Sequence, residues 1–120
     1  MHELSIAQSI LEIVYQHVPE DQCSGVRSVK VQVGRLSGVV PESLEFCFSA
    51  IIEATPLGEA RLDIVLTPVR AHCGECATTF ELEGTTFICP SCESIDLEIL
   101  SGTELQVIEV ELNEEKAPVP

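Results

Sequence analysis

The chain is short of positive charge. Its 120 residues include only six Lys and Arg against 20 Asp and Glu, which gives a formal net charge of −14. The basic residues are scattered along the sequence, whereas contacts to nucleic acid phosphates need clustered Lys and Arg. We therefore expect no nucleic acid partner. A negative field of this kind favours cations and basic protein surfaces.

Long apolar runs and a targeting segment are also missing. No stretch approaches the roughly 18 apolar residues of a membrane span, and the chain does not open with a basic segment followed by an apolar run. We expect a cytoplasmic protein that does not bind a membrane. Cys23 and Cys47 have no partner at a recognisable spacing, which suits a reducing compartment.

Catalytic motifs are absent as well. The sequence contains no paired nucleophile and base, no Gly-rich loop for a phosphate and no zinc motif with an open coordination position. Paired acids such as Glu42 and Glu45, in a predicted helix, fit a solvated or partner-facing surface better than a catalytic site. The sequence therefore does not predict an enzyme.

The strongest positive feature is a set of four cysteines in two Cys-x2-Cys pairs. Twelve residues separate the first pair, Cys73 and Cys76, from the second pair, Cys89 and Cys92. Two such pairs supply a tetrahedron of thiolates, the commonest signature of structural zinc. Disulfides or a redox Cys-x-x-Cys fit two matched pairs less well. Tetrahedral sulfur also accepts iron, so the spacing favours zinc without separating the two metals.

The residues around these pairs carry two further expectations. Many knuckles have Gly after the second cysteine, where the backbone is often left-handed, but this chain has Ala77 and Glu93. A non-Gly residue in that conformation costs about 1 kcal/mol, so we expect a mildly strained turn at each position. His72 adjoins Cys73, and we expect it to be simply exposed, although a role beside the metal also fits.

Apolar periodicity predicts a small α+β fold. Helical spacing occurs in two segments, and the alternation typical of strands occurs in four. A strand, a helix and a strand in this order favour a right-handed parallel crossover. We expect a three-stranded mixed sheet with two helices packed on it, and a frayed tail from Asn113 to Pro120. The predicted helices are 4–18 and 41–52, with a polar loop after the first, and the predicted strands are 28–34, 61–67, 95–101 and 103–112. Cys47 is expected to be a small core residue of the second helix. The predicted apolar faces are Leu4, Ala7, Leu11, Val14 and Val18 in the first helix, Leu44, Cys47, Phe48, Ile51 and Ile52 in the second, Val29, Val31 and Val33 in the first strand, and Leu62, Ile64 and Leu66 in the second.

The cysteine motif interrupts this fold. Residues 69–99 hold few large apolar side chains, and metal binding can supply on the order of 10 kcal/mol of folding free energy to such a module. We therefore expect an inserted zinc-ribbon domain at residues 69–99. Residues 1–68 and 100–120 are expected to form one α/β domain around it.

The first three residues form a second candidate metal site. The α-amine of Met1 with the backbone amide and imidazole of His2 can close two fused chelate rings around a metal, and Glu3 can add a donor through its amide or carboxylate. A plane of nitrogen donors suits nickel(II) or copper(II) better than zinc. The first N–H groups of a helix have no intrahelical acceptor, so an amide there can bind a metal without breaking a helix bond. By itself, this short motif also fits an ordinary surface terminus.

Several motifs, spread over nearly the whole chain, are similar to those of one family. They are the opening Met-His-Glu-Leu-Ser-x-Ala-Gln-Ser, the segment Val33–Leu44, the triplet Phe46-Cys47-Phe48, the turn Thr55-Pro56-Leu57-Gly58 and the cysteine quartet. Together they resemble the HypA/HybF family of hydrogenase maturation nickel chaperones. The resemblance implies a protein that passes nickel to the large subunit precursor of NiFe-hydrogenase, works with a nickel-dependent maturation GTPase, and in some organisms serves urease maturation proteins.

That resemblance also implies roles for the candidate residues. His2 is the expected nickel ligand, with contributions from the Met1 amine and Glu3, and the four cysteines are expected to hold structural zinc. Zinc bound by four thiolates has no open position, whereas a site at the chain end can pass its cargo on by ligand exchange. A rubredoxin-like iron electron carrier and a zinc-ribbon adaptor without nickel remain alternatives. A monomer and a homodimer are both compatible with the sequence.

Overall fold

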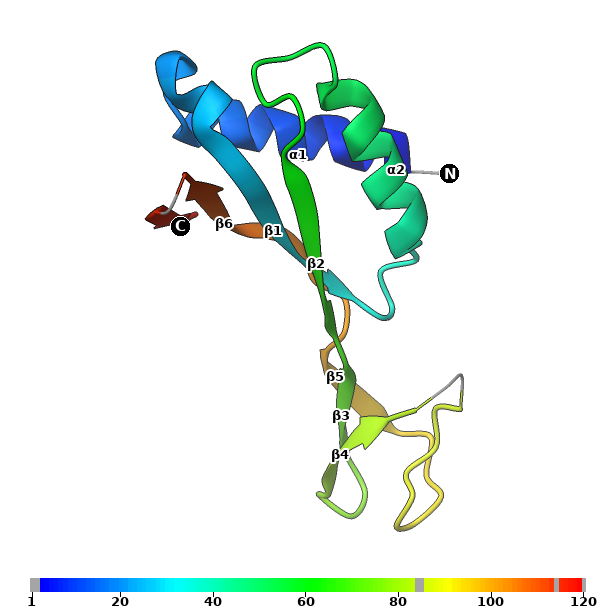
Figure 1. Cartoon of the computed structure of the whole chain (residues 1–120). Coiled ribbons are helices and arrows are strands. Elements are labelled where there is room, and N and C mark those ends of the chain that lie inside the picture. Colours follow the sequence, from blue (N-terminus) through cyan, green and yellow to red (C-terminus); the bar gives the residue numbers. More distant parts are fainter. Residues whose placement is uncertain (1–2, 84–85, 114, 120) are drawn as a thin grey trace. The chain divides into compact units, whose positions relative to one another are not determined.

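The computed structural model of the chain describes residues 3–83, 86–113 and 115–119 (Figure 1). The polar segment predicted as a loop after the first helix forms a short 3₁₀ helix, η1. No described helix has the length and apolar content that crossing a membrane needs. The elements are α1 (Glu3–His17), η1 (Glu20–Gly25), β1 (Val26–Gly34), α2 (Pro41–Ile52), β2 (Arg61–Thr67), β3 (Val69–Cys73), β4 (Thr79–Leu82), β5 (Leu97–Ser101), β6 (Leu105–Leu112) and β7 (Glu115–Pro118).

The strands form two sheets, and the predicted α+β class is confirmed. One sheet has four strands in the order β2-β1-β6-β7, and the other has three in the order β4-β3-β5. The chain also divides into two compact units. The first unit comprises Met1–Gln32, Val39–Val65 and Gln106–Pro120, and the second comprises Val33–Gly38 and Leu66–Leu105.

The larger sheet is mixed, with one strand more than predicted. β1 and β2 run in the same direction, as expected for a strand-helix-strand crossover (Figure 1). Side chains of β1 meet those of β6 in reverse order: Ser28 Oγ donates to Glu111 Oε1 at 3.2 Å, and Gln106 Nε2 donates to Gln32 Oε1 at 2.8 Å. These two strands are therefore antiparallel.

The expected frayed tail is wrong for part of the C-terminal segment. Residues Glu115–Pro118 form β7, which pairs antiparallel with β6 and sets Ala117 opposite Val110. Pairing along a strand edge is made by backbone N–H and C=O groups, so it needs no apolar alternation in the added strand. The prediction failed because it relied on that alternation alone.

Helix α1 buries part of the predicted stripe. Ala7, Ile10 and Val14 are buried, whereas Leu4 is 49% exposed and Leu11 is half-buried. Apolar residues surround more of this helix than one core-facing stripe requires, so periodicity alone could not choose among the possible faces. The helix therefore leaves apolar side chains outside the core.

Helix α2 follows the prediction more closely. Pro41 stands at its start, where a missing N–H costs nothing, and Leu44, Phe48 and Ile52 are at most 1% exposed. Cys47 was expected to be a small core residue, but it is only partly buried. The core of the first unit therefore rests on the i, i+4, i+8 stripe of α2.

Strand burial follows sheet position. Val29, Val31 and Val33 of β1 are 0% exposed, as their alternation predicted. In β2, Leu62 is 8% exposed, Ile64 is half-buried and Leu66 is 42% exposed, so the face that these three side chains share is buried only at its start. β2 lies at the edge of its sheet, where fewer neighbouring side chains cover a strand.

The second unit contains a close approach of two backbone segments. The amide of Gly34 donates to the Glu104 carbonyl and the amide of Leu36 donates to the Gly102 carbonyl, both at 2.7 Å. A Cβ atom at Gly34 would lie 2.1 Å from the Gly102 carbonyl carbon and oxygen. Gly102 itself has a φ of +115°, which side chains rarely adopt. Glycine is therefore needed on both segments.

Candidate metal centre

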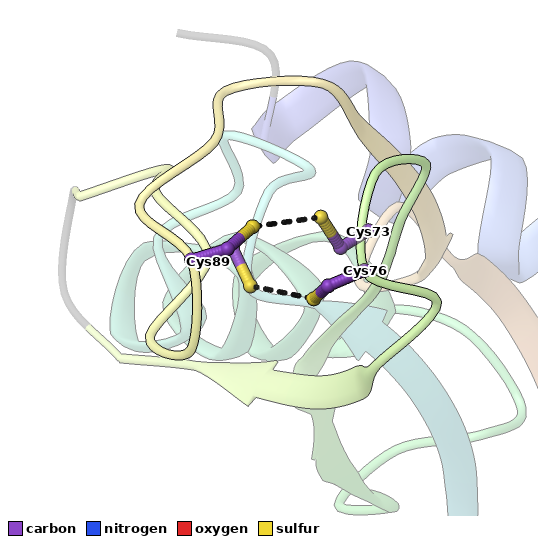
Figure 2. Close-up of side chains that lie close together, drawn as sticks. Cys73, Cys76 and Cys89 are labelled. Atoms are coloured by element: carbon purple, nitrogen blue, oxygen red, sulfur yellow. Dashed lines mark hydrogen bonds between the residues drawn. The ribbon is translucent and has the colours of Figure 1, made fainter.

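The four cysteines converge in the second unit. Their Sγ atoms all lie within 4.8 Å of one another, and Cys73 is placed by the end of β3. Figure 2 shows the side chains of Cys73, Cys76 and Cys89 pointing toward one another. The Sγ separations are 3.6 Å for Cys73 and Cys92 and 3.5 Å for Cys76 and Cys89. Four sulfurs at about 2.3 Å from a zinc ion would be about 3.8 Å apart, so the donor set fits a tetrahedral metal.

The two cysteine pairs are built by the same turn. The amide of Ala77 donates to the Cys73 carbonyl at 3.0 Å, and the amide of Glu93 donates to the Cys89 carbonyl at 2.9 Å. Ala77 and Glu93 both have a φ of 62°, which confirms the left-handed turns predicted after each pair. Each turn closes the chain back on its first cysteine and brings its two sulfurs together at the cost of some backbone strain.

A hydroxyl residue two positions after each pair completes the turn. The Cys73 amide donates to the Thr78 carbonyl and the Cys89 amide to the Ser94 carbonyl, both at 2.9 Å. Thr78 Oγ1 also lies 3.2 Å from Cys76 Sγ. The side chain and then the backbone amide of Thr78 lower the pKa of Cys76 to about 6. Sequence reasoning missed these residues, although a hydroxyl at the same position in both turns was a visible signal.

The pKa of Cys92 is shifted in the opposite direction to that of Cys76. The backbone amide of Ser94 lowers the pKa of Cys92, but desolvation and the neighbouring cysteines outweigh it and raise the pKa to about 12. Crowded thiolates repel one another, so the sulfurs cannot all lose their protons easily without a compensating charge. A dication at the centre would supply that charge and favour four thiolates.

A second contact ties the two turns together. The Gly74 amide donates to the Asp96 carbonyl at 2.9 Å, and the Asp96 amide donates to Ser94 Oγ at 3.0 Å. A Cβ atom at Gly74 would lie 2.5 Å from Asp96 Oδ2. No local pattern pointed to this link, because it joins residues more than twenty positions apart in the sequence.

His72 lies beside the cluster without joining it. Its Nδ1 is 3.0 Å from Thr79 Oγ1 in an exposed contact, and the side chain is only partly buried. Within the described ranges, the only group of three or more His, Cys, Asp or Glu side chains placed to share a metal is the cysteine quartet. The expected simple exposure of His72 is therefore met only in part, because its ring contacts Thr79.

Of the predicted nickel ligands, Met1 and His2 lie outside the described residues, and Glu3 is the first residue of α1. Glu3 is 7% exposed, and its Oε2 accepts a hydrogen bond from the Val40 amide at 3.2 Å. The terminal amino group of the chain lowers the pKa of this carboxyl, and the Val40 amide lowers it further, to about 2. The carboxylate of Glu3 therefore holds the start of α1 against the residue before α2.

Known proteins are similar to this chain over nearly its whole length. The family model described as "Hydrogenase/urease nickel incorporation, metallochaperone, hypA" matches residues 1–112. Hydrogenase maturation factor HypA of Desulfosudis oleivorans is 40% identical over 115 residues, which cover 95% of this chain and 100% of that protein. The corresponding factor of Geobacter sulfurreducens is 41% identical over 114 residues, with 93% and 99% covered.

A solved structure is similar as well. The solution structure of the Ni metallochaperone HypA from Helicobacter pylori has a TM-score of 0.63 and 26% identity, and the match covers 96% of this chain and 100% of that one. The sequence motifs, the mixed α+β fold and the cysteine quartet point the same way as these matches. The chain belongs to the HypA family of hydrogenase and urease nickel-incorporation metallochaperones.

Proposed function

We propose that this protein binds Ni(II) through Met1, His2 and Glu3 and delivers it during maturation of NiFe-hydrogenase. The observation that carries the proposal is the family match, which begins at residue 1 and therefore includes the candidate ligands. The similar protein of Helicobacter pylori is named a Ni metallochaperone. Nickel is cargo here, so its donors must be exchangeable, and donors at a chain end meet that need.

The contacts of Glu3 indicate which of its atoms would bind nickel. Its carboxylate already accepts the Val40 amide and is largely buried, so moving it to a metal would break that contact. Its backbone amide, at the start of α1, hydrogen-bonds the residue's own carboxylate rather than a helix carbonyl, so a metal bound there would break no bond of the helix. We therefore favour the amide, which with the Met1 amine and the His2 nitrogens would give the planar nitrogen set that nickel(II) accepts.

We propose that the resident metal of the cysteine quartet is structural zinc. The four sulfurs fill every position of a tetrahedron, which leaves none for a substrate. The apolar core of the ribbon sheet is small, with Val69, Ala71 and Leu82 buried. Zinc would supply folding free energy to this unit. Iron is the competing occupant, and metal analysis with visible absorption separates colourless zinc from a coloured iron-sulfur tetrahedron.

The partners follow from the same family. We propose that a hydrogenase maturation GTPase and the large subunit precursor of NiFe-hydrogenase are the proteins that exchange nickel with this chain. The family description also names urease, so urease maturation proteins are a second set of partners. None of these roles requires the protein to catalyse a reaction, and we propose no enzyme activity.

The nickel site is tested by calorimetric titration of zinc-loaded protein with no residue before Met1. His2→Ala should abolish stoichiometric nickel binding and leave the zinc content unchanged. His17→Ala is the matched control. His17 is the last residue of α1, and its Nδ1 lies 2.9 Å from the Ile13 carbonyl oxygen. Nickel affinity that is the same in His2→Ala as in the wild type would overturn the proposal.

A pH series gives a second test of the same donors. The α-amine has an ordinary pKa near about 8 and must lose its proton before it can bind nickel. Nickel affinity should therefore fall as the pH is lowered from 8 to 6. A flat profile over that range would exclude ligation by the amine.

A further inference from the structure

Helix α1 carries an apolar stripe that the core does not use. Leu4 is 49% exposed, Tyr15 is 44% exposed and Leu11, between them, is half-buried. Their spacings of seven and four residues place all three on one face of the helix. The buried residues Ala7 and Val14 lie on another face. The exposed stripe thus extends along nearly the whole helix, from its first turn to its last.

Helix α2 lies beside α1 (Figure 1). A hollow of about 380 Å³ is lined by Leu4 together with Ser43 and Phe46 of α2. Another, of about 360 Å³, is lined by Tyr15 together with Pro56, which follows α2. Leu4 and Tyr15 are about 16 Å apart along the helix, by the rise of 1.5 Å per residue. We call these two hollows, together with the stripe of Leu4, Leu11 and Tyr15 on α1, the helix groove.

Phe46 is the most exposed large side chain of the groove. It is 74% exposed, although Phe48, two residues later, is 0% exposed in the core. Aromatic side chains supply much of the binding energy of protein interfaces, because they bury a large apolar area with few rotatable bonds. The chain has only four Phe and no Trp, and Phe46 is the most exposed of the four. It lines the hollow at the Leu4 end of the groove.

The charge around the groove has one sign. Neither α1 nor α2 contains a Lys or Arg, and His17 is their only basic side chain. Glu12 of α1 and Glu42 and Glu45 of α2 are exposed. The groove thus has apolar walls with carboxylates nearby. Such a surface attracts a ligand that is apolar on one side and basic on the other.

We propose that the helix groove docks an amphipathic helix of a partner protein, with apolar residues at i, i+4 and i+7 and with Lys or Arg beside them. A groove of this length accepts about three helical turns, the usual size of helix-in-groove recognition. A docked helix would lie next to Leu4, which follows His2 by two residues in the sequence. Its use in nickel transfer rests on the proposed function, whereas the docking itself does not.

The probe for the experiment is a synthetic 15-residue peptide with Leu at i, i+4, i+7 and i+11 and Lys at its exposed positions. It is titrated into the zinc-loaded full chain by calorimetry and by amide chemical shifts. We expect saturable binding, with shifts gathered on Leu4, Tyr15 and Phe46. Phe46→Ser should weaken binding at least about ten-fold, which corresponds to 1.4 kcal/mol. Val65→Ser, at a 42% exposed apolar residue of β2, is the matched control and should bind as the wild type does.

Four outcomes would overturn the inference. Equal binding of a peptide with the same composition in scrambled order would reduce the effect to general charge attraction. Shifts gathered away from the groove, or an unchanged affinity in Phe46→Ser, would show that the groove is not the binding site. Conversion of a dimer to a monomer by Phe46→Ser in sedimentation would show that the occupant is a second copy of the chain. If His2→Ala kept its nickel while the peptide bound as expected, the proposed function would fail and the docking would stand.

Discussion

Glycine at the turn after a cysteine pair should strengthen the metal centre. Ala77 has a φ of 62°, a conformation that costs a residue with a side chain about 1–2 kcal/mol. Glycine removes this cost but gives the unfolded chain extra freedom, worth about 0.5–1 kcal/mol. The difference is about 0.5–1 kcal/mol in favour of Ala77→Gly. Since zinc binding and folding of this unit are coupled, zinc affinity should rise about two- to five-fold.

The assay is competition for zinc against a chromophoric chelator at constant pH. Ser91→Gly is the matched control. Ser91 is exposed and lies between the cysteines of the second pair, but its φ is not positive. With no strain to relieve, Ser91→Gly should lower zinc affinity by about the same factor, through the entropy of the unfolded chain alone. The reasoning is refuted if the two variants shift zinc affinity in the same direction.

Three other predictions concern stability. Gly34→Ala should lower the free energy of unfolding in urea by about 3 kcal/mol or more, because the added Cβ would lie 2.1 Å from the Gly102 backbone. Gly58→Ala is the control: its Cβ would have no atom within 4 Å, so the φ of +55° alone should lower the free energy of unfolding by about 1 kcal/mol. Thr67→Val should raise the free energy of unfolding by about 1 kcal/mol, since Thr67 Oγ1 is buried without a hydrogen-bond partner among the described residues; an equal loss would show that the hydroxyl has a partner. Removal of the metal by a chelator should collapse the amide shift dispersion of β3–β5, whose buried core is only Val69, Ala71 and Leu82, and leave the helical circular dichroism; retained dispersion would contradict a structural role.

Local patterns predicted the elements whose burial follows a single period. The alternation of Val29, Val31 and Val33 and the stripe of Leu44 and Phe48 both matched the core. The spacing of the cysteines predicted a cluster, and the sulfurs converge within 4.8 Å. In these cases the residues that form the pattern are the same residues that pack in the core or gather into the cluster. Their positions therefore follow from short-range spacing.

The features that were missed depend on distant parts of the chain. Helix α1 has apolar residues on several faces, so only the position of the sheet and α2 decides that Ala7 is buried and Leu4 is not. Strand β7 depends on the free edge of β6, and the link from Gly74 to Asp96 depends on how the two turns meet. Short-range patterns contain no information on these contacts.

X-ray absorption at the nickel and zinc edges, on protein with no residue before Met1 and loaded with both metals, distinguishes a nickel site at the N-terminus from one in the cysteine quartet. Nickel should be surrounded by nitrogen and oxygen with no sulfur neighbour, and zinc by four sulfurs at about 2.3 Å. His2→Ala should remove the nickel signal and leave the zinc signal unchanged. Sulfur neighbours around nickel would instead place the cargo in the cysteine quartet and refute the N-terminal site.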